Sequence, residues 1–192
     1  LVLGQKGREY PQPRQPSESA WDTVQLARHE QRPTALDYIW RMTSNFVEIR
    51  GDRLHGDDGA VVCGLADLSG QPVVVVGQER GHGRDGHNEG RAKPEGYRKA
   101  QRAMGLAAKF GLPLITFIDT PGADPGLESE ERGLATALST SLALMSQLPV
   151  PILSVVIGEG GSGGALALGL ADRILMLEHA IYSVISPEGC AS

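Results

Sequence analysis

Apolar and polar residues in the first quarter of the chain recur at helical spacing. Ser19 is a suitable N-cap for a helix that runs to about Glu30. Thr34 is a suitable N-cap for a second helix, from Ala35 to about residue 49. The apolar stripe predicted for the second helix consists of Leu36, Ile39, Trp40, Phe46 and Val47.

Two β-rich runs follow these helices. Residues 60–68 and 72–78 are rich in Val, and the short segment Ser69-Gly70-Gln71 separates them, which predicts a hairpin. Residues 80–93 contain Gly, His, Arg, Asp and Asn without periodicity, so we expect a long loop there, of the kind that often carries function.

Helical and strand patterns alternate in the rest of the chain. The order predicts an α/β fold whose later strands are mainly parallel. Residues 20–192 form one domain in this interpretation, preceded by an extended or disordered lead, residues 1–19, that is rich in Pro, Gln and charge. Pro187 is expected to start a further helix, which suggests that the C-terminal part of the domain is missing. The predicted elements are helix 94–110, strand 114–118, helix 128–147, strand 150–157, a glycine turn, helix 163–171, and strands 174–177 and 180–184.

Composition narrows the classes of function. A net charge of −5 argues against nucleic acid as the main partner. Cys63 and Cys190 lie far apart, and the five histidines lack metal-ligand spacing, so no metal site is expected. Since no apolar run approaches the ~20 residues that span a bilayer, we expect a soluble, cytoplasmic protein without a membrane association.

The most informative segment is the glycine-rich run 158–165, between an apolar strand and a small-residue helix. Glycine lets another molecule approach the main chain closely. The N–H groups at a helix N-terminus lack internal partners and suit a developing oxyanion. Residues 119–126 repeat the arrangement after another apolar run, so the two turns are expected to form one shared site.

Other motifs fit the same glycines. Gly158, Gly160 and Gly163 match the GxGxxG pattern of dinucleotide-binding folds, but the acidic residue expected after a second strand is missing. Residues 160–164 match the GxSxG nucleophile elbow of hydrolases, with Ser162 as the nucleophile. Its triad partners would have to be Asp172 and His179.

Several charged residues are weaker candidates. Asp119 is interpreted first as a residue that holds its turn and second as a general base. Glu159 and Glu188 are acids in glycine-containing loops and either is a candidate to orient a ligand. The cations that could meet phosphate or carboxylate, or else form a solvated helix face, are Arg91, Lys93, Arg98 and Lys99.

Long stretches of the chain closely resemble the carboxyltransferase α subunit of bacterial acetyl-CoA carboxylase, and the resemblance covers nearly everything from Trp21 to Ser192. The segments that carry it are Glu95-Gly-Tyr-Arg-Lys-Ala100, Thr116-Phe-Ile-Asp-Thr-Pro-Gly-Ala123, Glu130-Glu-Arg-Gly133, Val156-Ile-Gly-Glu-Gly-Gly-Ser-Gly-Gly-Ala-Leu-Ala167 and Tyr182-Ser-Val-Ile-Ser-Pro-Glu-Gly-Cys-Ala-Ser192.

The resemblance implies a crotonase-like fold of ββα units and the transfer of a carboxyl group from carboxybiotin, on a carrier protein, to acetyl-CoA, which gives malonyl-CoA for fatty acid synthesis. It implies that the amides of Gly163 and Gly164 hold the negative ureido oxygen and that biotin itself removes the substrate proton. The implied partners are a β subunit, the biotin carboxyl carrier protein and biotin carboxylase. The β subunit would contain a zinc ribbon and would form a heterotetramer with this chain. The residues expected to bind biotin or substrate are Gly122, Ala123, Gly160, Gly161, Ser162 and Ala165.

The chain departs from this family in two places beside the expected site. The loop 80–93 has glycine, acids and histidine in place of several lysines and arginines, and Asp124 stands where the family usually has an aromatic residue. Acyl length, the identity of the β partner, and a natural β-α fusion are left open. The alternatives are a non-catalytic acyl-CoA-binding or scaffold paralogue, a biotin-independent acyl-CoA decarboxylase, and a hydrolase that uses Ser162.

Overall fold

The structure, a computed structural model, describes residues 19–82 and 87–192; the rest of the predicted lead and the middle of the loop 80–93 lie outside the described residues. Within them one mixed sheet runs in the order β1 to β6, and β7 pairs with the far end of β5. The first three strands are antiparallel and the others parallel. The strands are β1 (Ser44–Glu48), β2 (Val61–Leu68), β3 (Gln71–Gln78), β4 (Leu114–Thr120), β5 (Ile152–Gly161), β6 (Arg173–Met176) and β7 (Ile181–Ser183).

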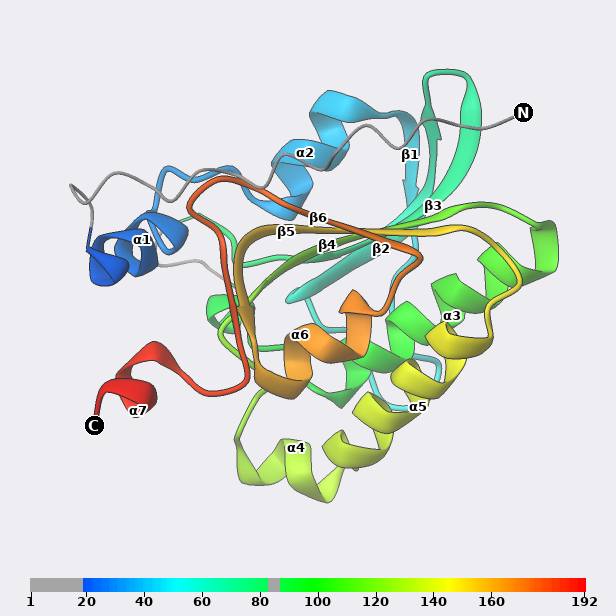
Figure 1. Cartoon of the computed structure of the whole chain (residues 1–192). Coiled ribbons are helices and arrows are strands. Elements are labelled where there is room, and N and C mark those ends of the chain that lie inside the picture. Colours follow the sequence, from blue (N-terminus) through cyan, green and yellow to red (C-terminus); the bar gives the residue numbers. More distant parts are fainter. Residues whose placement is uncertain (1–18, 83–86) are drawn as a thin grey trace, which may run out of the picture.

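Helices cover both faces of the sheet (Figure 1). The longest helices, α3 and α5, lie with α6 on one face, and α2 lies on the other. Because both faces are covered, β4 is buried along its whole length and β3 from Val73 onward, as expected for central strands of an α/β sheet. The helices are α1 (Ala20–Ala27), α2 (Ala35–Met42), α3 (Pro94–Phe110), α4 (Leu127–Glu131), α5 (Leu134–Gln147), α6 (Ser162–Gly169) and α7 (Pro187–Ala191), with a short 3-10 turn, η2 (Asn88–Gly90).

Several elements confirm the sequence predictions. Ser19 caps α1 in a capping box with Asp22, and α3 ends at Gly111, whose φ of 64° needs the freedom of glycine. The predicted hairpin is present, with a turn of only two residues, Ser69 and Gly70, both at positive φ.

The predicted helix from Ala35 to residue 49 is wrong in its second half. Helix α2 ends at Met42, and residues 44–48 form β1, which pairs with the edge of β2. The backbone of Thr43 is extended. Its Oγ1 donates to the carbonyl oxygen of Ile39 at 2.7 Å, which gives a carbonyl of the last helical turn a hydrogen-bond donor. The pairing available at the β2 edge therefore overrides the helical spacing of Phe46 and Val47.

Two further boundaries differ from the prediction. The helix expected over residues 128–147 is divided into α4 and α5 at Gly133, which has a left-handed φ of 79°. Residues 158–161, expected in a glycine turn, continue β5 as a strand. Three of these residues have to be glycine, because side chains at Gly158, Gly160 and Gly161 would overlap Asp119, Tyr182 and Pro121.

Candidate functional site

Two strand-to-helix bends meet beyond the carboxyl ends of β4 and β5. The first bend, residues 120–126, leads from β4 to α4; the second bend, residues 161–164, leads from β5 into α6. A Cβ atom built on Gly164 would lie 2.6 Å from Ala123 N and 2.7 Å from the carbonyl carbon of Gly122. The two main chains are therefore in direct contact, so the fold brings together the two turns that the sequence predicts as one site.

Side-chain hydrogen bonds hold the first bend. Thr120 Oγ1 accepts from Gly122 N at 3.0 Å and donates to Gly122 O at 2.7 Å, and Gly122 has a φ of 149°, which favours glycine. Asp124 accepts from the Ser129 hydroxyl and from Asn88 Nδ2. Burial raises the pKa of Asp124, but these hydrogen bonds outweigh it and lower the pKa below its usual value. The Asp124 carboxylate thus stabilises the bend itself.

The second bend differs, because no side chain of the described residues caps its amides. Gly161 is the N-cap of α6. The N–H groups of a first helical turn have no carbonyl one turn earlier to accept them, and they carry the positive end of the helix dipole. Gly163 is half-buried, and a Cβ atom there would meet only Leu138 Cδ1, at 3.7 Å. This arrangement suits an anionic oxygen next to the amides of Gly163 and Gly164.

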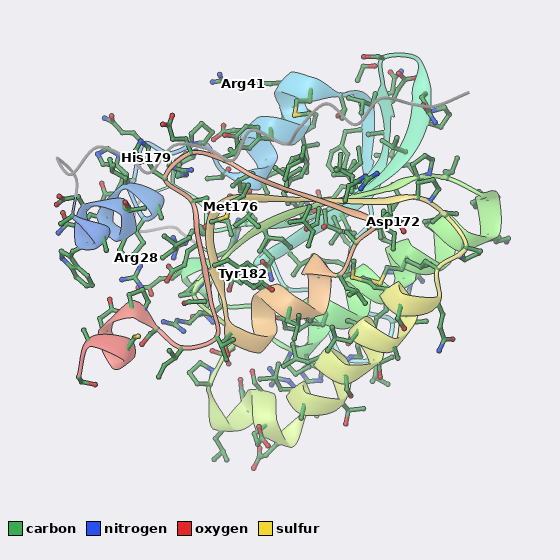
Figure 2. The ribbon with its side chains drawn as sticks, viewed as in Figure 1. Arg28, Arg41, Asp172, Met176, His179 and Tyr182 are labelled. Atoms are coloured by element: carbon green, nitrogen blue, oxygen red, sulfur yellow. The ribbon has the colours of Figure 1, made fainter. Side chains whose placement is uncertain are left out.

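The other predicted binding residues have different surroundings. Gly160 lies against the ring of Tyr182, and Gly161 lies against the main chain of Pro121. Figure 2 shows Tyr182 beside α6. Ala165 is fully buried in the main core cluster, whereas Ser162 is exposed. Close packing therefore accounts for Gly160, Gly161 and Ala165, while Gly163 and Ser162 border solvent.

Ser162 has part of the geometry of a nucleophile elbow. Its φ of 51° lies in the left-handed region, at a strand-to-helix junction, and its side chain is exposed. The structure does not bring its predicted partners together: Asp172 precedes β6 and His179 follows it, at opposite ends of the strand (Figure 2). Asp172 Oδ2 accepts instead from Ile152 N at 2.8 Å. Within the described ranges, no histidine or carboxylate hydrogen-bonds to the Ser162 hydroxyl.

A cluster of ionic side chains lies next to the two bends, and sequence reasoning did not predict it. Arg28 binds both carboxylate oxygens of Glu159, at 2.9 and 2.7 Å, and also pairs with Glu188 of α7. Arg80 binds Glu159 at 3.0 Å and lies 3.6 Å from Asp119. Figure 2 shows Arg28 between α1 and α7. Glu159 and Glu188, considered as ligand-orienting acids, are thus neutralised by arginines.

No sequence signal could have found this cluster, because its members are not neighbours along the chain. Arg28 and Glu159 are 131 residues apart. The cluster borders a pocket of about 660 Å³ between α1 and the start of the loop 80–93. The described residues that line this pocket are Ala27, Arg28, His29, Glu30, Arg32, Thr34, Arg80, Gly81, Glu89 and Asp119.

Asp119 joins the strands that lead into the two bends. Its Oδ1 accepts from Glu159 N at 2.9 Å, so it bonds to β5 rather than to its own turn. Burial raises the pKa of Asp119 to about 6, even though Arg80 and the Glu159 amide favour its charged form. The Asp119 carboxylate therefore links β4 to β5, whereas the sequence analysis expects it to hold its own turn.

Two of the four candidate cations are committed to ion pairs within the fold. Lys99 is buried and donates to Asp57 at 2.6 Å, and Arg98 binds Asp52 at 2.8 Å and Glu95 at 3.1 Å. Arg91 differs, because its nearest carboxylate is 3.9 Å away and its Nη1 lies 4.0 Å from the position of a Cβ on Gly122.

In the described part of the chain no helix is long and apolar enough to cross a membrane, and no group of His, Cys, Asp or Glu side chains is arranged to hold a metal ion.

The sequence has close relatives. Residues 6–192 match the family described as acetyl co-enzyme A carboxylase carboxyltransferase-like. The chain is 58% identical, over 90% of its length, to the acetyl-coenzyme A carboxylase carboxyl transferase subunit alpha of Acinetobacter baumannii. It is 57% identical, over 91% of its length, to the subunits beta/alpha protein of Salinispora arenicola. The chain spans 64% of the first relative and 31% of the second.

Solved structures with low identity share the fold. The chain is similar to transcarboxylase 12S, with a TM-score of 0.73 and 22% identity, over 89% of this chain and 32% of that one. It is also similar to the beta subunit of geranyl-CoA carboxylase from P. aeruginosa, with a TM-score of 0.68 and 23% identity, over 81% and 32% of the two chains. The predicted α/β, crotonase-like fold is confirmed. The chain belongs to the acetyl co-enzyme A carboxylase carboxyltransferase-like family.

Proposed function

We propose that this chain carries the biotin side of an acetyl-CoA carboxylase carboxyltransferase and takes part in the transfer of a carboxyl group from carboxybiotin to acetyl-CoA. The names of its relatives support this reaction. The observation that carries the proposal is the N-terminus of α6, where the amides of Gly163 and Gly164 have no side-chain cap and adjoin the first bend.

The residues present fit such a ligand. A ureido oxygen that gains negative charge needs donors that are already in place, and main-chain amides at a helix N-terminus provide them without reorganisation. When bound, carboxybiotin would supply the carboxyl group and the base for the substrate proton. The chain therefore has to orient the anionic oxygen and exclude water. Gly122 and Ala123 would form the wall beside it, through the contact with Gly164.

The partners in this proposal are a carboxyltransferase β subunit in a heterotetramer, the biotin carboxyl carrier protein and biotin carboxylase. The β subunit would bind the acyl-CoA thioester, and the product malonyl-CoA would serve fatty acid synthesis in the cytoplasm. The relative that carries beta and alpha subunits in one chain supports a close association of the two parts.

The experiment combines the chain with a carboxyltransferase β subunit, carboxylated carrier protein and acetyl-CoA, and measures malonyl-CoA. The reverse reaction, malonyl-CoA with free carrier, is followed by the loss of malonyl-CoA. Turnover that requires both subunits is the expected result. Binding of acyl-CoA without turnover with any β subunit would favour a scaffold, and turnover without the carrier would favour a biotin-independent decarboxylase.

A further inference from the structure

Gln78, the last residue of β3, reaches α6 across the neighbouring strand. Its side chain is fully buried, and its Nε2 donates to the carbonyl oxygen of Gly164 at 2.8 Å. Strand β4 separates β3 from β5, the strand that leads into α6. This bond thus ties the first turn of α6 to a strand that takes no part in the second bend.

Gly164 is enclosed on its other sides. A Cβ atom there would lie 2.6 Å from Ala123 N and 2.9 Å from the hydroxyl of Tyr97, a fully buried residue of α3. The first bend and Tyr97 therefore limit how far the turn can move toward them, while Gln78 holds it through its carbonyl. Together these contacts fix the turn that presents the amides of Gly163 and Gly164.

The buried amide side chain of Gln78 costs stability. Gln78 Oε1 is buried and has no hydrogen-bond partner among the described residues, whereas Nε2 bonds to Gly164. An apolar side chain of similar size would avoid this penalty. The one bond that Gln78 makes is directed at the candidate site, which points to a role in its geometry.

We propose that Gln78 is a positioning residue that fixes the first turn of α6, so that the amides of Gly163 and Gly164 point toward the reacting oxygen. This inference rests on the proposed function. It differs from that function in that it assigns a task to a buried residue that does not touch the substrate.

The test uses a matched pair of substitutions. Gln78→Met removes the bond to Gly164 and keeps the side-chain volume. Gln101→Met is the control, because Gln101 Nε2 also donates to a main-chain carbonyl at 2.8 Å, that of Ala137, but its bonds go to α5 and not to either bend. Both variants are assayed with the β subunit, and the 15N and 1H amide shifts of Gly163 and Gly164 are recorded on the chain alone.

We expect Gln78→Met to lower kcat about tenfold while KM for acetyl-CoA changes less than about twofold, because the loss concerns alignment of donors rather than acyl-CoA binding. The amide resonances of Gly163 and Gly164 should move in this variant. Gln101→Met should leave kcat, KM and these resonances unchanged. Unmoved resonances in Gln78→Met, or an equal loss of kcat in both variants, would overturn the inference.

Gln78→Glu provides a second variant that keeps the shape. A protonated carboxyl group can donate to the Gly164 carbonyl, whereas a buried carboxylate cannot. Activity should therefore approach that of the wild type at low pH and decline as the new carboxyl ionises, with a pH profile that Gln101→Glu does not share. Identical profiles for the two glutamates would refute the positioning role. The amide shifts test it even if the wild-type chain transfers no carboxyl group, which would refute only the proposed function.

Discussion

The two bends reach the same place by different means. In the first bend, polar side chains hold the main chain: Thr120 bonds twice to Gly122, and Asp124 accepts from Ser129 and Asn88. In the second bend, glycines allow the main chain to pack directly on its neighbours. No side chain of the described residues caps the N-terminus of α6.

This difference follows from what each bend must do with its amides. The Gly122 amide is used inside the first bend, so that bend serves as a wall. The second bend can leave amides available only if its shape is fixed without them, by close packing and by the bond from Gln78. Removing the polar atoms of its own side chains should therefore damage the first bend, whereas added atoms should damage the second.

The largest effect is expected for Gly164→Ala. The new Cβ would overlap main-chain atoms of the first bend, which cannot move without separating the two bends. We expect a loss of about 3 kcal/mol in the free energy of unfolding and of about 100-fold in kcat. Urea unfolding and the carboxyl-transfer assay measure these.

Gly163→Ala is the matched control, because its Cβ would meet only Leu138, at 3.7 Å. It should change stability by less than about 1 kcal/mol. Equal destabilisation by the two alanines would contradict the packing assigned to the second bend.

Asp119→Asn tests the link between the strands that lead into the bends. Burial raises the pKa of Asp119 to about 6, so the folded protein keeps a proton that the unfolded chain releases near pH 4. The free energy of unfolding of the wild type should thus fall as pH rises from about 4 to about 6, by on the order of 2 kcal/mol relative to Asp119→Asn.

The asparagine can still accept from Glu159 N through Oδ1, so the hydrogen bond itself is retained. Unfolding is followed in urea at half-unit pH steps. Parallel stability curves for the two proteins would show that Asp119 titrates normally in the folded state.

Thr120→Val removes the polar atom that holds the first bend. The buried Gly122 amide and carbonyl would lose their bonds, which should cost about 1.5 kcal/mol. Thr116→Val on the same strand is the control, since Thr116 Oγ1 is buried without a partner in the described residues. This second change should be neutral or stabilising in thermal unfolding, and an equal loss in both would speak against the assignment.

The smallest effect is expected for Ser162→Ala. The Ser162 hydroxyl has no histidine or carboxylate partner among the described residues, so carboxyl transfer should stay within about twofold and stability within about 0.5 kcal/mol. Ester hydrolysis measured with p-nitrophenyl acetate should not change either. Loss of an esterase activity in this variant alone would revive the hydrolase alternative.

Local signals in the sequence were sufficient for much of the fold. The hairpin around Gly70 and helix α3 with its Gly111 stop follow from turn and cap chemistry. The end of α2 at Met42 does not follow from local signals, because it depends on the pairing of residues 44–48 with β2. For the same reason no local pattern indicates that residues 158–161 form a strand: Asp119, Tyr182 and Pro121, which require glycine at positions 158, 160 and 161, come from distant segments.

The candidate site was predictable only in part. The glycine run indicated where amides are available, and the contact between the bends matches the expectation of a shared site. The Arg28 pairs and the bond from Gln78 to Gly164 join residues 131 and 86 positions apart, beyond the reach of local patterns.

The proposed function requires the amide of Gly163 to donate to an anionic oxygen during carboxyl transfer. Replacing that one amide by an ester, through incorporation of glycolic acid at position 163, deletes the N–H and adds no side chain. The matched control is the same backbone change at Ala135, the second residue of α5. We expect a kcat about 100-fold lower for the ester at 163 and an unchanged kcat for the ester at 135. Full activity with the ester at 163 would show that the Gly163 amide does not bind the anionic oxygen.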